Sequence, residues 1–193
     1  MIYYAKSDTR ETIKAHTEQV LLRLQEYKRI YGRALFLLSE RDWQLLEIAV
    51  KYHDVGKADL FFQNKIRKKI GEKEIEVVSQ HDVPHNFLSV MAIPFKDLGL
   101  NKEEQRLVSQ VVAFHHERNI PIDEIRVAIV DHYKKHFLPY KQLIEDHLGL
   151  NIDEKVRASK LNALEYQNRI RPDDPLYYRY VLLKGLLHRF DHA

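Results

Sequence analysis

The sequence of 193 residues contains no cysteine, and only 6 glycines and 6 prolines interrupt it. The absence of cysteine excludes disulfides, Cys-ligated zinc, iron–sulfur clusters and thiol nucleophiles, and it fits a reducing compartment. No run of eighteen apolar residues occurs, and the first residues lack the pattern of a signal peptide. We therefore expect a cytoplasmic protein that has no membrane partner.

The composition is that of a folded, helix-rich protein, with 45% hydrophobic and 31% charged residues. A chain of this length can bury one core, so we expect a single domain over residues 1–193. Lys and Arg together number 31 against 28 acidic residues, and this net charge of +3 is too small to identify a nucleic-acid binder. Histidine, with 11 residues, is the unusual count.

Apolar residues recur at helical spacing along the chain, and no alternating strand pattern is apparent, so the predicted fold class is all-α. Ser39 with Asp42, and Asn101 with Glu104, have the spacing of capping boxes that start helices. The first helix should begin after Ser7 or Thr9 and reach residue 32. Further helices are expected over residues 39–53, 61–70, 85–93, 101–116, 121–149, 153–170 and 176–193.

Four of these helices place a histidine or an aspartate on, or at the end of, a core-facing stripe. The residues concerned are His16, His53, Asp54, His115, His116 and Asp191. A lone histidine on an apolar face is usually a core residue, but several together favour a metal site. Imidazole and carboxylate suit Mn, Fe, Co, Ni or Zn, and ligands from several helices can hold two ions inside a bundle. Asp54 is the natural bridge, and two bridged ions can hydrolyse a phosphodiester without a protein nucleophile.

The segment His53-Asp54-Val55-Gly56-Lys57 resembles the HD-x-G-K signature of HD-superfamily phosphohydrolases. Other matching segments are KAHT at 14–17, PHNFLS at 84–89, HHER at 115–118 and GLLHRFDHA at 185–193. In order and spacing they resemble the HD nuclease domain of the CRISPR-associated type I interference nuclease-helicase. The resemblance spans essentially the whole chain and implies a compact HD-domain helical bundle with a dinuclear metal site in its core.

The resemblance also implies an activity, which is cleavage of single-stranded DNA with two divalent ions of Mn, Ni, Co, Fe or Mg. One ion would be held by His16, His53, Asp54 and Asp191, and the second by Asp54, His85, His115 and His116. Asp54 and Lys57 would be the catalytic residues, and Lys57 and Ser89 would bind substrate. A solvated lysine at a helix end remains the alternative for Lys57, and Ser89 could instead orient His85 or pack.

Members of the family act with a helicase that feeds them unwound DNA. This chain has no G-x-x-x-x-G-K-[ST] phosphate loop, so an ATP-driven step would lie elsewhere. The implied partners are a helicase domain, on the same longer polypeptide or on a separate subunit, and an RNA-guided CRISPR surveillance complex.

Some polar residues resemble site residues without matching the pattern. His81-Asp82 is expected in a loop because Val83-Pro84 follows it, and Asp131-His132 could be mistaken for the distal aspartate. Asp59 and Glu117 are expected to be solvated surface residues. The remaining histidines are predicted to be surface residues or partners of ligands, namely His136, His147, His188 and His192.

Two further questions stay open at this stage. The basic run at residues 65–69, with Phe61 and Phe62, either follows a DNA backbone or forms a solvated helix face. A phosphohydrolase acting on a nucleotide or cyclic dinucleotide would share the metal chemistry, and a metal-stabilised interaction module would share the ligands without turnover. An open groove would suit a polymer, whereas a closed pocket would suit a nucleotide.

Overall fold

The computed structural model describes residues 1–32, 37–76, 83–116 and 122–193. Its α-helices are α1 (Ile13–Tyr31), α2 (Glu40–Tyr52), α3 (Leu60–Ile70), α4 (His85–Ala92), α5 (Lys102–Ala113), α6 (Ile122–His132), α7 (Lys141–Leu148) and α8 (Tyr177–Asp191). Within these described ranges the extended pairing is a single isolated bridge between Tyr4 and Thr12. The all-α prediction is therefore confirmed.

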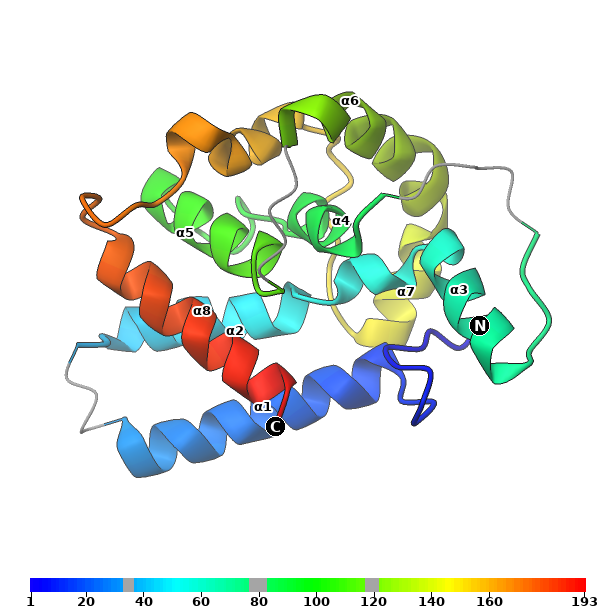
Figure 1. Ribbon diagram of the computed structural model, residues 1–193, viewed down its shortest axis with the longest axis horizontal. Coiled ribbons are helices and arrows are strands. Elements are labelled where there is room, and N and C mark those ends of the chain that lie inside the picture. Colours follow the sequence, from blue (N-terminus) through cyan, green and yellow to red (C-terminus); the bar gives the residue numbers. More distant parts are fainter. Residues whose placement is uncertain (33–36, 77–82, 117–121) are drawn as a thin grey trace.

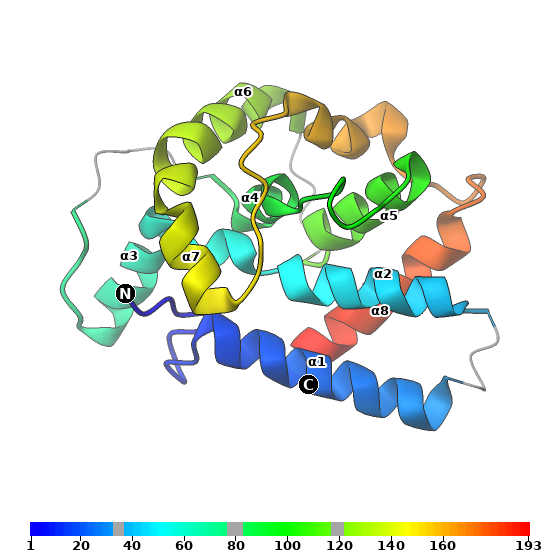
Figure 2. The same cartoon turned by 180° about the vertical axis from the view of Figure 1, so that it is seen from behind.

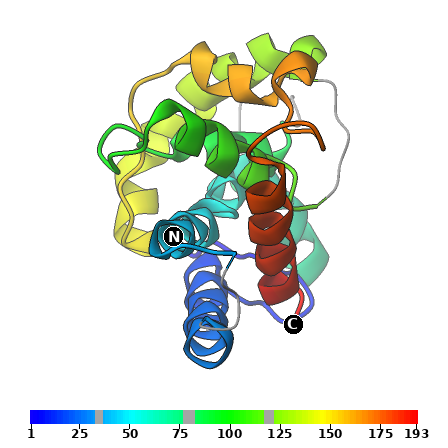
Figure 3. The same ribbon diagram turned by 90° about the vertical axis from the view of Figure 1, so that its left-hand side faces the viewer.

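The helices form layers around a central pair. In Figure 1, α1, α2 and α8 lie in the lower half, α4 and α5 lie in the middle, and α6 lies along the top. The side view in Figure 3 shows the same order, with the segment around residues 158–168 beside α6 in the upper layer. Seen from behind in Figure 2, α7 descends from α6 toward the first turns of α1.

The core is centred on α4, of which every residue is buried. This helix packs against α5, against α2 and against the short 3-10 helix Val55–Ala58 that follows α2. Side chains on α4 are consequently held by packing from several directions, which suits residues that must keep one orientation. None of the helices in the described part of the chain is both long and apolar enough to cross a bilayer.

Both predicted capping boxes are present and set where two helices begin. The Ser39 side chain accepts from the Asp42 N–H while the Asp42 carboxylate accepts from Ser39, and Asn101 and Glu104 do the same for α5. Each box satisfies backbone N–H groups that a helix start leaves without partners. The helices that follow end at Tyr52, directly before His53-Asp54, and at Ala113, separated by one residue from His115-His116.

The first helix starts later than predicted, at Ile13 rather than after Ser7 or Thr9. Thr12 is the N-cap, and its hydroxyl accepts from the Ala15 N–H at 3.1 Å. The residues before it fold back, because the Ile13 N–H donates to the Tyr3 carbonyl at 2.9 Å. A buried Tyr3 anchors this turn, so tertiary packing prevails over the local cap signal.

The prediction of an α-helix over residues 153–170 was wrong. This region instead forms two 3-10 segments, Ala158–Leu164 and Tyr166–Asn168. Its polar groups bond to other elements, since Lys160 donates to the Met91 and Ile93 carbonyls and Arg126 donates to the Ala158 carbonyl. Leu161 and Leu164 are both buried, which fits the three residues per turn of a 3-10 helix.

The helical stretch predicted for residues 121–149 is broken. Pro121 lies outside the described residues, and after α6 the chain passes through a π-helical turn (Tyr133–Phe137) and a 3-10 turn (Leu138–Tyr140) before α7. Pro139 lies in the 3-10 turn and has no N–H to donate, which explains the interruption. Gly149 is the C-cap of α7 with φ 67°, so the helical region ends near residue 149 as expected.

Candidate metal centre

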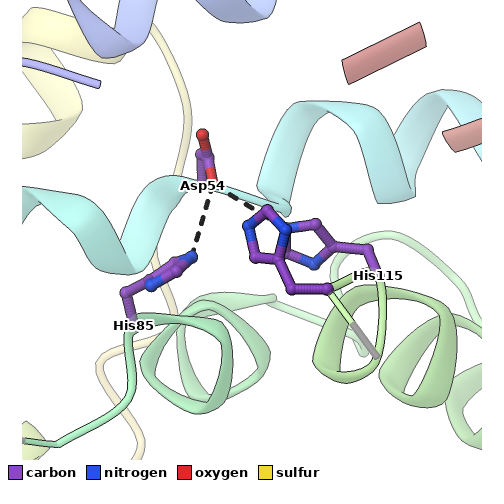
Figure 4. Close-up of side chains that lie close together, drawn as sticks. Asp54, His85 and His115 are labelled. Carbon is purple, nitrogen blue, oxygen red and sulfur yellow. Dashed lines mark ion pairs between the residues drawn. The ribbon is translucent and has the colours of Figure 1, made fainter. Parts of the chain in front are cut away.

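The centre is built around Asp54, which directly follows the C-cap of α2. Its side chain is buried, and its two oxygens face different histidines. Oδ2 lies 3.5 Å from His53 Nε2 and 3.7 Å from His16 Nε2. Oδ1 lies 3.6 Å from His85 Nε2 and 3.9 Å from His115 Nε2. Figure 4 marks both contacts with dashed lines. One carboxylate is therefore shared between two sets of imidazoles.

Two groups of ligand-type side chains result, and in each the ligand atoms lie within 4.8 Å of one another. We name the first the α1/α8 group, made of His16, His53, Asp54 and Asp191. We name the second the α4/α5 group, made of Asp54, His85, His115 and His116. These are the two sets that the family resemblance implied from sequence, and their roles as ligands remain a prediction.

The α1/α8 group joins the two ends of the described chain. His16 lies in the first turn of α1, and its Nε2 is 2.8 Å from Oδ1 of Asp191, the last residue of α8. His53 Nε2 lies 3.7 Å from the same oxygen. All members of the group are buried, so packing of α1 and α8 on α2 determines its geometry.

The α4/α5 group is formed where two helices meet (Figure 4). His85 is the first residue of α4, and His115 and His116 follow α5. The ring centroids of His115 and His116 are 3.9 Å apart, and those of His85 and His116 are 5.5 Å apart. His116 is half-buried whereas the other members are buried, so this group reaches solvent at His116.

Two imidazoles are oriented by carbonyls of their own helices. His53 Nδ1 lies 2.7 Å from the Val50 carbonyl, and His115 Nδ1 lies 2.6 Å from the Val112 carbonyl. A carbonyl only accepts, so Nδ1 carries the proton and the Nε2 lone pair faces Asp54. Within the described ranges, both Nε2 atoms and Asp54 Oδ1 are buried and have no hydrogen-bond partner. Leaving buried polar atoms without a partner costs free energy unless another group binds them. The histidines and Asp54 therefore fit divalent ions as their partners.

The local charges keep the carboxylates ionised. Burial alone would raise the pKa of Asp54, but the Lys57 ammonium and His53 outweigh it and lower that pKa. Burial likewise opposes ionisation of Asp191, yet the hydrogen bond from His16 and the nearby His53 and Lys57 leave its pKa lowered. Burial holds the pKa of His115 well below its ordinary value, so this imidazole is neutral and able to donate its lone pair.

Lys57 lies beside the shared carboxylate and is not a solvated residue at a helix end. Its Nζ is 2.6 Å from Asp54 Oδ2, and the residue is buried. Its carbonyl accepts from the Gln63 Nε2 at 2.6 Å, and Gln63 also bonds the backbone of Tyr4 at 2.8 Å. Gln63 is fully buried, and the sequence reasoning missed this contact because no local pattern marks it.

Ser89 and Gly56 bring the Asp54 turn against α4. The Ser89 hydroxyl donates to the His53 carbonyl at 2.8 Å and accepts from the Gly56 N–H at 2.8 Å. Ser89 is fully buried, so in this structure its contacts hold the turn in place. A Cβ on Gly56 would lie 1.9 Å from the His85 carbonyl oxygen, which explains why glycine occupies this position.

Asp59 is not the solvated surface residue that the sequence suggested. It is buried, its Oδ1 caps α3 by accepting from the Phe61 N–H, and its Oδ2 lies 2.8 Å from His132 Nε2. His132 is also buried, whereas its neighbour Asp131 is exposed. The position of Asp59 just before an apolar helix was the available signal, since aspartate favours N-caps. His81, Asp82 and Glu117 lie outside the described residues.

Three residues outside the implied ligand sets lie close to the centre. His188 is exposed, and its Nδ1 is 3.1 Å from the backbone carbonyl of His115. His192 Nε2 is 3.7 Å from Asp191 Oδ2, and His192 forms a third, more exposed group with His116 and Asp191. Glu11, which the sequence reasoning did not consider, lies 3.3 Å from His16.

The all-helical fold, the clustered histidines and aspartates and a match to a family model together define a class, the HD domain of metal-dependent hydrolases. Residues 7–165 match the family model described as "Cas3, HD domain", so the chain belongs to that family of CRISPR-associated HD phosphohydrolases and nucleases. Its fold is similar to the solved structure of the CRISPR-associated Cas3 HD domain protein MJ0384 from Methanocaldococcus jannaschii. The TM-score is 0.60 at 19% identity, with 99% of each chain covered. A comparison with curated proteins gave no match.

Proposed function

We propose that this chain hydrolyses phosphodiester bonds of single-stranded DNA in CRISPR interference, using two divalent ions. The observation that carries the proposal is Asp54, a buried carboxylate whose two oxygens face two separate sets of imidazoles. Membership of the Cas3 HD-domain family supports nuclease chemistry in a CRISPR system.

In this proposal the α1/α8 group holds one ion, the α4/α5 group holds the other, and Asp54 belongs to both. When bound, such ions lower the pKa of water and stabilise charge that develops on phosphoryl oxygens. His53 and His115 present Nε2 lone pairs without needing to reorient, because carbonyls already hold their Nδ1 protons. Mn, Ni, Co, Fe and Mg are the candidate ions.

Lys57 is the residue to which we assign contact with the scissile phosphate. An ammonium group beside a metal site suits a phosphate oxygen, and its backbone is held by Gln63. The pairing of Lys57 with Asp54 also keeps that carboxylate ionised before any ion binds. For Ser89, the contacts with His53 and Gly56 support a positioning role over direct substrate contact.

The surroundings of His85 favour a polymeric substrate over a nucleotide. The Phe62 ring lies 5.2 Å from the His85 ring, so the start of α3 adjoins the α4/α5 group. The same helix exposes Lys68 and Lys69, and Lys65 Nζ lies 5.1 Å from the Phe61 ring. Cations interleaved with aromatic rings suit a single strand with unpaired bases.

We further propose a single domain over residues 1–193 in the cytoplasm, with a helicase and an RNA-guided surveillance complex as partners.

The test is cleavage of circular single-stranded DNA by metal-stripped protein after Mn, Ni, Co, Fe or Mg is added separately. We expect metal-dependent cutting that falls by about three orders of magnitude in Asp54→Ala, because several kcal/mol of transition-state stabilisation are lost. Asp131→Ala is the matched control, since Asp131 also adjoins a histidine but is exposed and belongs to neither ligand group.

Each alternative has its own outcome. Equal cutting by Asp54→Ala and the parent would mean that the site assignment is wrong. Hydrolysis of a cyclic dinucleotide without any cutting of DNA would favour the nucleotide phosphohydrolase. Metal binding with no hydrolysis of either substrate would favour an interaction module.

A further inference from the structure

We propose that Glu11 is a positioning residue of the α1/α8 group, whose carboxylate holds His16 in the orientation that binds an ion. This inference rests on the proposed metal site and deepens it. It adds a residue outside the HD signature and outside every segment that carried the family resemblance.

The contact lies on the side of His16 that faces away from the ligand group. Glu11 Oε2 is 3.3 Å from His16 Nδ1, while His16 Nε2 is 2.8 Å from Asp191 Oδ1. The imidazole is 1% exposed, and the Glu11 side chain is 13% exposed. The ring therefore lies between the Glu11 carboxylate on its Nδ1 side and the ligand group on its Nε2 side.

His53 and His115 each obtain a partner for Nδ1 from their own helix, whereas His16 needs one from elsewhere. Those two histidines follow helix C-termini, where the last carbonyls have no helical N–H partner and can accept from Nδ1. His16 instead lies in the first turn of α1, and its own N–H already occupies the Thr12 carbonyl at 2.9 Å. A side chain from outside the helix must therefore face Nδ1, and among the described contacts that side chain is Glu11.

The backbone before α1 is built to place Glu11. Its carbonyl accepts from the Ala5 N–H at 2.7 Å, and Lys6 Nζ lies 3.5 Å from its carboxylate. Arg10, the preceding residue, has φ 53°, and it alone among the described non-glycine residues has a positive φ. Residues other than glycine rarely adopt that conformation, and such strain persists where the surrounding structure imposes it.

A carboxylate has a stronger effect on the ring than a carbonyl. The 3.3 Å contact is an ion-pair distance, and His16 Nδ1 has no hydrogen-bond partner among the described residues. A carboxylate in this position favours the tautomer with its proton on Nδ1, which leaves the Nε2 lone pair for an ion. Removing such a partner typically weakens metal affinity by about 10- to 100-fold. The effect should be confined to the ion of the α1/α8 group, because Glu11 contacts none of the α4/α5 side chains in the described contacts.

The experiment is a titration of metal-stripped Glu11→Gln with Mn by calorimetry, which reports each binding event separately and needs no activity. We expect one of two ions to bind about 10- to 100-fold more weakly and the other to bind as in the parent. Glu72→Gln is the matched control, because Glu72 anchors the same N-terminal segment through Tyr4 and Arg67 but does not contact His16. It should leave both affinities unchanged.

A double-variant cycle separates positioning from general stability. In a His16→Ala background, Glu11→Gln should cause no further loss of affinity, since the ring through which it acts is gone. Additive losses, unchanged Mn binding by Glu11→Gln, or equal weakening of both ions would each overturn the proposal. A parent protein that binds two ions but cuts no single-stranded DNA would overturn the proposed substrate, and a selective Glu11 effect would still support the present inference.

Discussion

The α1/α8 group and the α4/α5 group share Asp54 but differ in chemistry and in origin. The first combines two carboxylates with two imidazoles, all buried, and joins residues 16 and 191. The second has three imidazoles and only the shared carboxylate, and it reaches solvent at His116. Oxygen ligands suit Mg and Mn, whereas imidazole suits Ni, Co and Zn, so we expect the two groups to prefer different ions.

The two groups also differ in how they hold protons. Burial lowers the pKa of both His53 and His115, but Asp54 and Asp191 act together on His53 and leave its pKa raised. His115 is influenced by Asp54 alone among the carboxylates, and the nearby histidines oppose that influence. The number of carboxylates around a buried imidazole therefore decides the direction in which its pKa shifts.

The largest expected effect comes from breaking the turn at which both groups meet. Gly56→Ala would place a Cβ 1.9 Å from the His85 carbonyl oxygen and 2.8 Å from the Ser89 nitrogen, both of them backbone atoms that cannot easily move. We expect the free energy of unfolding of the metal-free protein to fall by about 3 kcal/mol, measured by urea denaturation.

Gly185→Ala in α8 is the matched control, with the opposite sign. A Cβ there meets nothing within 4 Å, and the residue lies inside a helix. Alanine should raise the free energy of unfolding by about 0.5–1 kcal/mol, because glycine loses more conformational freedom on folding. If both variants changed stability in the same direction, the close approach at Gly56 would not explain its effect.

A second pair of variants should separate the two groups. His16→Ala and His115→Ala each remove one predicted ligand. Each should therefore weaken the binding of one ion by at least about 100-fold, or about 2.7 kcal/mol, and leave the binding of the other ion unchanged. Equilibrium dialysis followed by measurement of bound metal would report this as one ion lost per variant. Loss of both ions in either variant would show that the groups do not bind independently.

The smallest expected effect concerns the first turn of α8, at the opposite end of the helix from Asp191. Arg179 Nε lies 2.6 Å from the Asp42 carboxylate and ties α8 to the start of α2. Burial opposes ionisation of Asp42, but Ser39 and Arg179 outweigh it and lower its pKa. Asp42→Asn should cost about 1–2 kcal/mol of unfolding free energy at pH 7, through the lost cap and the lost charged hydrogen bond.

The pH dependence of that difference has a definite sign. A lowered native pKa contributes stability above the unfolded pKa of about 3.9, and the contribution is lost as pH falls below that value. Parent and variant should therefore converge in stability as the pH falls below about 4, as thermal unfolding at several pH values would show. A constant difference across that range would mean that the charge of Asp42 is not responsible.

Local signals in the sequence accounted for much of the helical framework. Apolar spacing and two capping boxes located α2 and α5, and the positions of His53 and His115 at their ends followed from that. The same signals failed at residues 153–170, which form no regular α-helix. Lys160 in this segment bonds to the distant Met91 carbonyl, and Arg126 of α6 bonds to the Ala158 carbonyl within it. Propensity describes a segment by itself, and these bonds depend on what lies next to it.

By itself, the sequence determined the helical class and the ligand-type residues, because helix periodicity and side-chain chemistry are local properties. Only the tertiary structure decided that His16 faces Asp191, 175 residues away, that Glu11 stands behind it, and that the two oxygens of Asp54 face different groups. Metal sites require ångström-scale distances between atoms on separate helices, and those distances are set by how the helices pack.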